Sequence, residues 1–286
     1  MKQKNEDQKS LKELRSMLKF KESDKHTNTQ HYKGLLDSAF ADRRYGLEEP
    51  CLMDWDILVE ETSFHRWWNT ESSSLLFLSG KNWITVNNST LSWLSYVAVL
   101  LTQKLLQDNR NVAYYFCQAD NMLTDRRRRT IQDLMASLLY QIANSQPKLL
   151  RSGVETFRDA IASDEWNSEN EEAALEAMAA LLIEVLSTLY SDEEFTLVID
   201  RVDQCRWSSE SEDSGSSIEN VLFWLLHVIR KVPCTVKIVV ITYSTSMGNL
   251  SHSVRNRLQK RGGERYIERT DWHQEGQTSR SVSPPI

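Results

Sequence analysis

The sequence predicts an α/β fold in which a parallel sheet carries helices on both faces. Four apolar runs are short enough and apolar enough to be strands buried on both faces, at 75–78, 112–117, 195–199 and 237–242. Longer segments place apolar residues at the three- and four-residue spacing of helices, at 91–107, 130–143, 171–190 and 218–231. Short apolar runs that alternate with such helices are typical of parallel strands joined by crossover helices.

Polar and charged stretches divide the chain into four parts. Residues 1–31 are dominated by Lys, Glu, Asp, Gln and Asn, so we expect a mobile, disordered N-terminal arm. Residues 32–70 carry spaced aromatic and apolar positions that predict a helical linker, and residues 71–262 form the α/β domain. Within that domain, SSESEDSGSS at 208–217 has no apolar residue and is expected to be a flexible loop. For the polar tail at 263–286 we expect disorder.

The composition narrows the class of protein. The 286 residues carry a formal net charge of −6, which argues against general binding to nucleic acid or to an anionic membrane. No apolar run approaches the roughly 20 residues of a membrane span, and we recognise no signal peptide, so we expect a cytoplasmic protein with the nucleus as the alternative. The four cysteines form no CxxC pair, which predicts reduced thiols and no zinc site. We interpret the four arginines at 126–129 as a solvated face, with an acidic partner or nuclear import as alternatives.

A strand, a glycine turn and a helix follow one another from residue 75, which is the arrangement that a phosphate-binding loop requires. The turn departs from G-x-x-x-x-G-K-[ST], because GKNWITVNNST at 80–90 lacks the second glycine and the lysine. The candidate nucleotide-binding residues are Gly80, Lys81, Asn88, Ser89 and Thr90. The hydroxyl of Ser89 either contacts magnesium or caps the helix, and capping is the simpler interpretation.

A second candidate site lies at the end of the strand at 195–199, which is followed by Asp200, Asp203 and Gln204. An acid at the carboxyl end of a parallel strand lies where ligands bind in open α/β sheets, so Asp200 and Asp203 are candidate magnesium ligands. The simpler alternative is an acid that ends the strand in solvent. We expect Asp200 to lie beside Gly80 at one rim of the sheet. Because Gln204 can orient water but cannot take its proton, we expect little or no hydrolysis.

Together, these segments resemble the NACHT branch of the STAND-type P-loop NTPases, in particular the nephrocystin-type N-terminal segments of fungal multidomain proteins. The likeness covers roughly residues 32–245. It is carried by LLDSAF at 35–40 with RR at 43–44, FHRWW at 64–68, LLFLSGK at 75–81, DLMASLLYQI at 133–142 and LVIDRVDQ at 197–204. The resemblance implies a P-loop NTPase-like fold and an oligomerisation switch that ATP or GTP controls.

This sequence departs from the family's pattern at positions that carry the family's motif residues. The departures are Asn87 and Asn88 at the last glycine and lysine of the loop, Arg201 at a glycine, Gln204 at a glutamate and Tyr243-Ser244 at an arginine. Loss of the lysine alone removes roughly 1.5–3 kcal/mol, or about one to two powers of ten in affinity. We therefore expect weak or absent binding of Mg²⁺ with ATP or GTP.

The favoured hypothesis is a degenerate, truncated NACHT-like module that acts in signalling or regulation through contacts with other proteins, including self-association. The alternative is an active ATP- or GTP-hydrolysing switch in which Lys81 supplies the missing charge. A gene-model error across 82–88 would also explain the altered loop.

Overall fold

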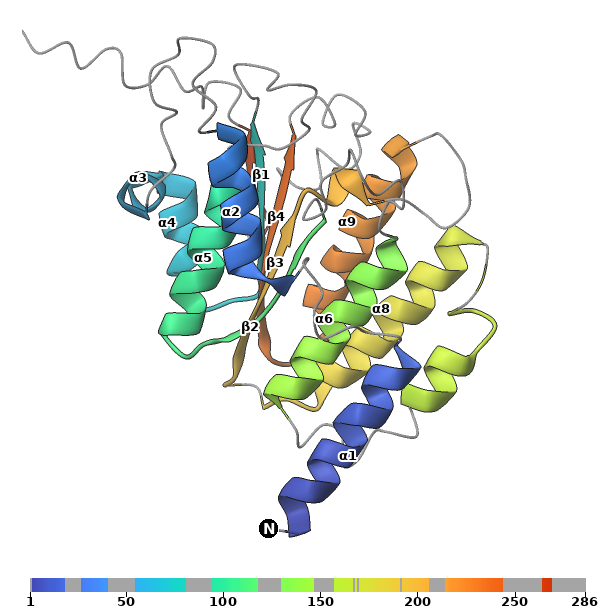
Figure 1. Ribbon diagram of the computed structural model, residues 1–286. Helices are drawn as coiled ribbons and strands as arrows, with labels where there is room; N and C mark the ends of the chain where they lie inside the picture. The colour runs from blue at the N-terminus through green and yellow to red at the C-terminus, as the bar shows by residue number, and fades with distance from the viewer. Residues whose placement is uncertain are drawn as a thin grey trace, which may run out of the picture.

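In a computed structural model of the protein, five parallel strands form one sheet with helices on both faces (Figure 1). The structure describes residues 2–18, 27–40, 55–80, 94–117, 130–146, 157–166, 168, 170–190, 192–205, 214–243 and 264–268. The strands are β1 (Ser74–Gly80), β2 (Asn111–Phe116), β3 (Glu194–Asp200), β4 (Thr235–Tyr243) and β5 (Glu264–Glu268). Their order across the sheet is β2-β3-β4-β1-β5. The expected P-loop NTPase-like α/β fold is confirmed.

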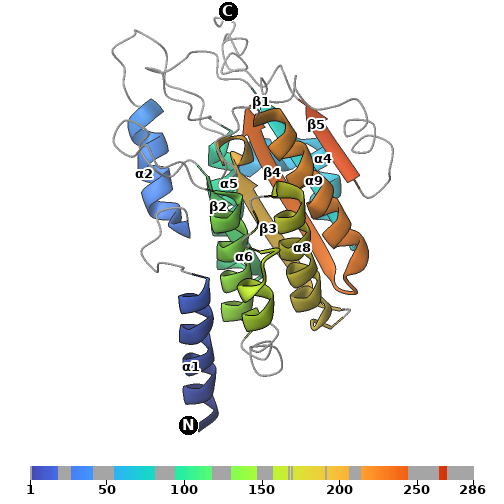
Figure 2. The same ribbon diagram turned by 90° about the vertical axis from the view of Figure 1, so that its right-hand side faces the viewer.

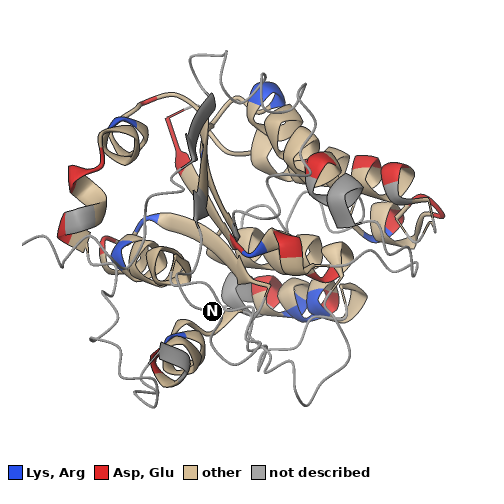
Figure 3. Cartoon of the chain, turned by 90° about the horizontal axis from the view of Figure 1, so that it is seen from above, with Lys and Arg blue, Asp and Glu red and all other residues tan. Residues whose placement is uncertain are grey.

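Two groups of helices cover the sheet, which lies between them when viewed from above (Figure 3). One face carries α2 (Thr29–Phe40), α3 (Trp55–Glu60), α4 (Thr62–Trp68) and α5 (Ser95–Gln107). The other carries α6 (Ile131–Ser145), α8 (Glu171–Ser187) and α9 (Ser214–Lys231). None of the helices in the described segments combines the length and apolarity needed to cross a membrane.

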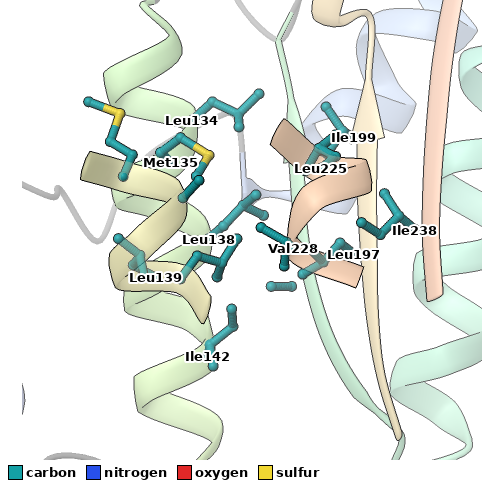
Figure 4. Close-up of a cluster of buried hydrophobic side chains, with 14 of the residues drawn as sticks. Leu134, Met135, Leu138, Leu139, Ile142, Leu197, Ile199, Leu225, Val228 and Ile238 are labelled. Atoms are coloured by element: carbon teal, nitrogen blue, oxygen red, sulfur yellow. The ribbon is translucent and has the colours of Figure 1, made fainter. Parts of the chain in front are cut away.

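The larger part of the core lies under α6, α8 and α9 (Figure 4). Alternate residues of each strand point to this face, so Leu197, Ile199 and Ile238 of the sheet meet α6 and α9. A capping box between Thr130 and Asp133 fixes where α6 begins, because it satisfies backbone N–H groups that the helix cannot. The four strands and four helices expected from the apolar pattern are all present, with ends shifted by a few residues.

Two elements differ from the expected arm and tail. Helix α1 (Lys2–Met17) lies beside α6 (Figure 2), and Leu14 and Leu18 are buried in the larger core cluster. This narrow apolar stripe orders a segment whose overall composition is typical of disorder. Strand β5 occupies part of the expected tail and pairs with β1 at the edge of the sheet. A five-residue edge strand has one neighbour and needs no continuous apolar run, so the sequence pattern did not reveal it.

At the opposite edge of the sheet, a side chain forms hydrogen bonds with the backbone of strand β2. Gln141 of α6 accepts a hydrogen bond from the Tyr114 N–H (3.1 Å) and donates one to the Tyr114 carbonyl (2.8 Å). These are backbone groups that a further strand would otherwise pair with. Gln141 therefore satisfies both backbone groups of Tyr114 at this edge and joins α6 to β2.

We predict that Gln141→Ala lowers the free energy of unfolding by about 1–3 kcal/mol, because it leaves both backbone groups of Tyr114 without this partner. Urea denaturation measures the loss. Gln146→Ala is the matched control, since Gln146 bonds the side chain of Asn111 rather than its backbone, and should cost less. Equal losses in the two variants would contradict the proposed role of Gln141.

Candidate functional site

The connections of the sheet diverge at the carboxyl ends of β1 and β3. Helix α5, which follows β1, packs on one face, whereas α9, which follows β3, packs on the other. Ligands of open α/β sheets bind in the crevice that such a divergence creates. Gly80 ends β1 and Asp200 ends β3, so both candidate groups lie at this rim.

The two groups are not neighbours, and this corrects the expectation that they lie side by side. Strand β4 runs between them, with Tyr243 in register with Gly80 and Ile241 in register with Asp200. Two strand spacings separate them laterally by roughly 10 Å. The sequence pattern identified the strands but not their order, because β4 is the last of the four in the chain and enters the middle of the sheet.

Asp200 is fully buried and both of its carboxylate oxygens accept hydrogen bonds. The Tyr32 hydroxyl of α2 donates to Oδ2 (2.6 Å), and the Ser95 hydroxyl, at the start of α5, donates to Oδ1 (3.1 Å). The Tyr32 ring stacks on Phe116 of β2 with 4.6 Å between centroids. The alternative that Asp200 ends its strand in solvent is therefore wrong.

Burial is the largest influence on the pKa values of Asp200 and Tyr32. Removal from water raises the pKa of Asp200 to about 7, although the Tyr32 hydrogen bond, the Arg201 charge and the Ser95 hydrogen bond favour the ionised form. Burial, followed by the charge of Asp200, raises the pKa of Tyr32 well above its ordinary value. Tyr32 consequently remains a protonated donor to Asp200.

A second closed cluster follows in the 3-10 helix η3 (Val202–Gln204). The Arg201 guanidinium donates through Nε and a terminal nitrogen to both oxygens of Asp203, with a shortest distance of 2.7 Å. Gln204 Nε2 donates to the same carboxylate (2.9 Å). The side chains of Arg201 and Asp203 are 2% and 4% exposed, so this ion pair is shielded from solvent. Asp203 is thus held by its neighbours, and Gln204 points its amide at that acid.

Arg201 has left-handed backbone angles, with φ 57° and ψ 46°. Its N–H donates to the Ile241 carbonyl (2.7 Å), and its carbonyl accepts from the Gln204 N–H (2.8 Å), which fixes this bend against β4. Glycine adopts such angles without steric cost, whereas other residues rarely do. The backbone therefore retains the shape that suits the glycine expected here, with an arginine in its place.

The described cysteines are free thiols, and two of them, Cys117 and Cys205, lie near this rim. Among the described residues, Cys117, Cys205 and Cys234 are free and buried. Burial, followed by a hydrogen bond with the Cys205 side chain, raises the pKa of Cys117 well above its ordinary value. Neither sequence spacing nor composition indicated that Cys117 and Cys205 meet.

Several residues expected at the site lie outside the described residues. These are Lys81, Asn88, Ser89 and Thr90, together with the arginines at 126–129. The hydroxyl that reaches Asp200 from α5 belongs to Ser95, which no motif indicated. Tyr32 could not be predicted either, because no local pattern indicates contact with an acid 168 positions away.

The described residues do not fit a magnesium ion in this arrangement. No group of three or more His, Cys, Asp or Glu side chains is placed to hold a metal within the described segments. Asp200 has no exposed surface, and Asp203 is paired with Arg201. A cation would have to displace a hydroxyl from Asp200 before it could bind there.

Comparison with known families agrees with this fold. A family model described as "Nephrocystin 3, N-terminal" matches residues 54–242, about two thirds of the chain. The chain belongs to the nephrocystin-3 N-terminal family. This family is a NACHT-like NTPase region, which suggests a NACHT-type nucleotide-binding module. No curated protein matches the chain.

We predict that Arg201→Gly is more stable than Arg201→Ala by about 1 kcal/mol, because only alanine retains the strain of left-handed angles. Both variants lose the guanidinium and leave Asp203 unpaired, so both should lose about 3–5 kcal/mol relative to the native protein. Chemical denaturation of the three proteins gives the comparison. An alanine variant as stable as the glycine variant would show that the bend does not require left-handed angles.

We also predict that Asp200→Asn changes how stability depends on pH. The raised pKa of Asp200 means that its contribution is fully present below about 3.8, the ordinary value, and is lost as the pH rises through about 7. The asparagine variant should therefore gain stability relative to the native protein between pH 4.5 and 7.5. Urea denaturation at both pH values measures this, and Asp56→Asn on α3 controls for loss of one carboxylate. A constant difference between native protein and Asp200→Asn would refute the prediction.

Proposed function

We infer that the chain is a degenerate NACHT-type nucleotide-binding module that acts in signalling or regulation through contacts with other proteins, including other copies of itself. It binds ATP or GTP with magnesium weakly or not at all, and it hydrolyses them slowly or not at all. The inferred compartment is the cytoplasm. The observation that carries this proposal is that neighbouring side chains already donate hydrogen bonds to the carboxylates of Asp200 and Asp203 at the rim.

The two acids support this proposal because neither offers a free carboxylate. Tyr32 and Ser95 donate to Asp200, and Arg201 and Gln204 donate to Asp203. Efficient phosphoryl transfer depends on charged groups and a metal ion that are already in position when the nucleotide arrives. Here each acid would first have to exchange a hydrogen-bond partner.

The altered phosphate loop supports the same proposal from the sequence. Asn88 stands where the family has its lysine, and an amide cannot replace a positive charge beside phosphate. Gln204 stands where the family has a glutamate, so a general base for the attacking water is missing. Binding and hydrolysis are therefore weakened by separate substitutions.

We predict that Asn87→Gly combined with Asn88→Lys tightens the binding of ATP with magnesium by roughly 10- to 100-fold, because it restores a charge-assisted bond. Titration of a fluorescent ATP analogue measures both affinities, and phosphate release measures turnover. The native protein should bind weakly and release no phosphate above background. Turnover by the native protein at roughly 1 s⁻¹ or faster that disappears in Asp200→Ala would overturn the proposal.

The same titration tests the alternative in which Lys81 supplies the missing charge. Under the proposed function, Lys81→Ala leaves the affinity of the native protein unchanged. A loss of affinity by tenfold or more would instead favour the active switch.

A further inference from the structure

The outer face of helix α9 carries an aromatic cluster at its centre. Helix α9 lies beside α8 on the face of the sheet that holds the larger core (Figures 1 and 2). Its inner face is buried, whereas Phe223 is 43% exposed and Trp224 and His227 are partly exposed. The Trp224 ring meets both Phe223 and His227 edge to face, with 5.4 Å between ring centroids in each case. The three rings thus form one continuous surface that solvent reaches.

An exposed aromatic surface of this kind is suited to protein contacts. Aromatic side chains are enriched at the centres of protein–protein interfaces, because they bury a large area with little loss of side-chain freedom. In an isolated domain the exposed part of Phe223 gains none of the free energy that burial of apolar surface provides. A partner that covers α9 would recover it.

Charged residues of opposite sign flank the aromatic cluster. Glu219 lies one turn before Phe223, and Arg230 lies about two turns after it. With His227 they follow four-, four- and three-residue spacing, which places all four on one face of the helix. Arg230 is exposed and Glu219 is partly exposed. This face is therefore acidic at its amino end, aromatic in the middle and basic at its carboxyl end.

Such a face is complementary to a second copy of itself. When two α9 helices pack antiparallel about a twofold axis, Glu219 of one copy lies opposite Arg230 of the other, and Phe223 lies opposite His227. Each pair then occurs twice, because both copies use the same surface. Antiparallel packing also places opposite ends of the helix dipoles side by side. A parallel arrangement would bring like charges together, so the charges select one orientation.

We propose that α9 is a self-association surface, on which two copies of the chain pack their α9 helices antiparallel. The inference rests on the proposed function, which includes contacts between copies, and it names the surface that makes them. One helix face is smaller than the roughly 800 Å² per partner that stable interfaces bury. The association is therefore weak and depends on protein concentration.

Sedimentation velocity of the full chain over a rising concentration series tests the surface. Phe223→Glu places a charge at the centre of the contact. Leu106→Glu is the matched control, because Leu106 is 46% exposed and lies on α5, at the other face of the sheet. The native protein should associate as its concentration rises. Phe223→Glu should weaken the association by about tenfold or more, and Leu106→Glu should leave it unchanged. Thermal melting shows that each variant is folded.

Two charge variants test the antiparallel pairing itself. Glu219→Lys and Arg230→Glu each place like charges opposite one another in a pair of identical copies, so each alone should associate several-fold more weakly than the native protein. An equimolar mixture of the two variants restores opposite charges in the mixed pair and should recover the native affinity. A defect confined to one chain, such as a loss of helix stability, is not recovered by mixing.

The inference is refuted if the native protein stays monomeric at every concentration, if Phe223→Glu associates as tightly as the native protein, or if the mixture associates no more tightly than its two components. A monomeric native protein leaves the weak nucleotide binding of the proposed function intact. Rapid nucleotide turnover by a native protein that still associates would instead overturn the degenerate module and not the surface.

Discussion

The arrangement of the rim depends on one constraint, the burial of the Asp200 carboxylate. A carboxylate taken from water is destabilised unless donors replace its hydration. Three elements supply that replacement: α2 through Tyr32, α5 through Ser95, and the bend after β3 through the charge of Arg201. Their positions relative to β3 are consequently coupled to the charge of one side chain.

The bend after β3 shows how an arginine is accommodated at a glycine-like position. Left-handed angles cost an arginine roughly 1–2 kcal/mol. Here the guanidinium pairs with Asp203, its charge acts on Asp200, and it has almost no exposed surface. The positive charge offsets part of the repulsion between Asp200 and Asp203, which would otherwise disfavour two buried carboxylates. The arginine thus stabilises an arrangement of the rim in which Asp203 is paired and shielded from solvent.

Local sequence predicted the fold well and the site only in part. Strands β1 to β4 and their helices followed from apolar spacing, because each buries a face whose period is visible in a short window. Strand β5, the ordered part of α1 and the place of β4 depend on contacts between distant segments. The same holds for Tyr32 and Ser95: the pattern located Asp200, but its hydrogen-bond partners are 168 and 105 positions away.

Stability alone does not explain why a buried acid occupies position 200. Buried charged groups are often replaced by apolar side chains with no loss, and sometimes with a gain, of stability. The end of β3 is otherwise apolar and fully buried, so a hydrophobic residue would suit the sheet there. What this acid provides that an apolar residue could not is a pair of hydrogen bonds that join α2 and α5 to the end of β3. The Tyr32–Asp200 hydrogen bond is therefore the contact that joins the linker to this rim of the sheet.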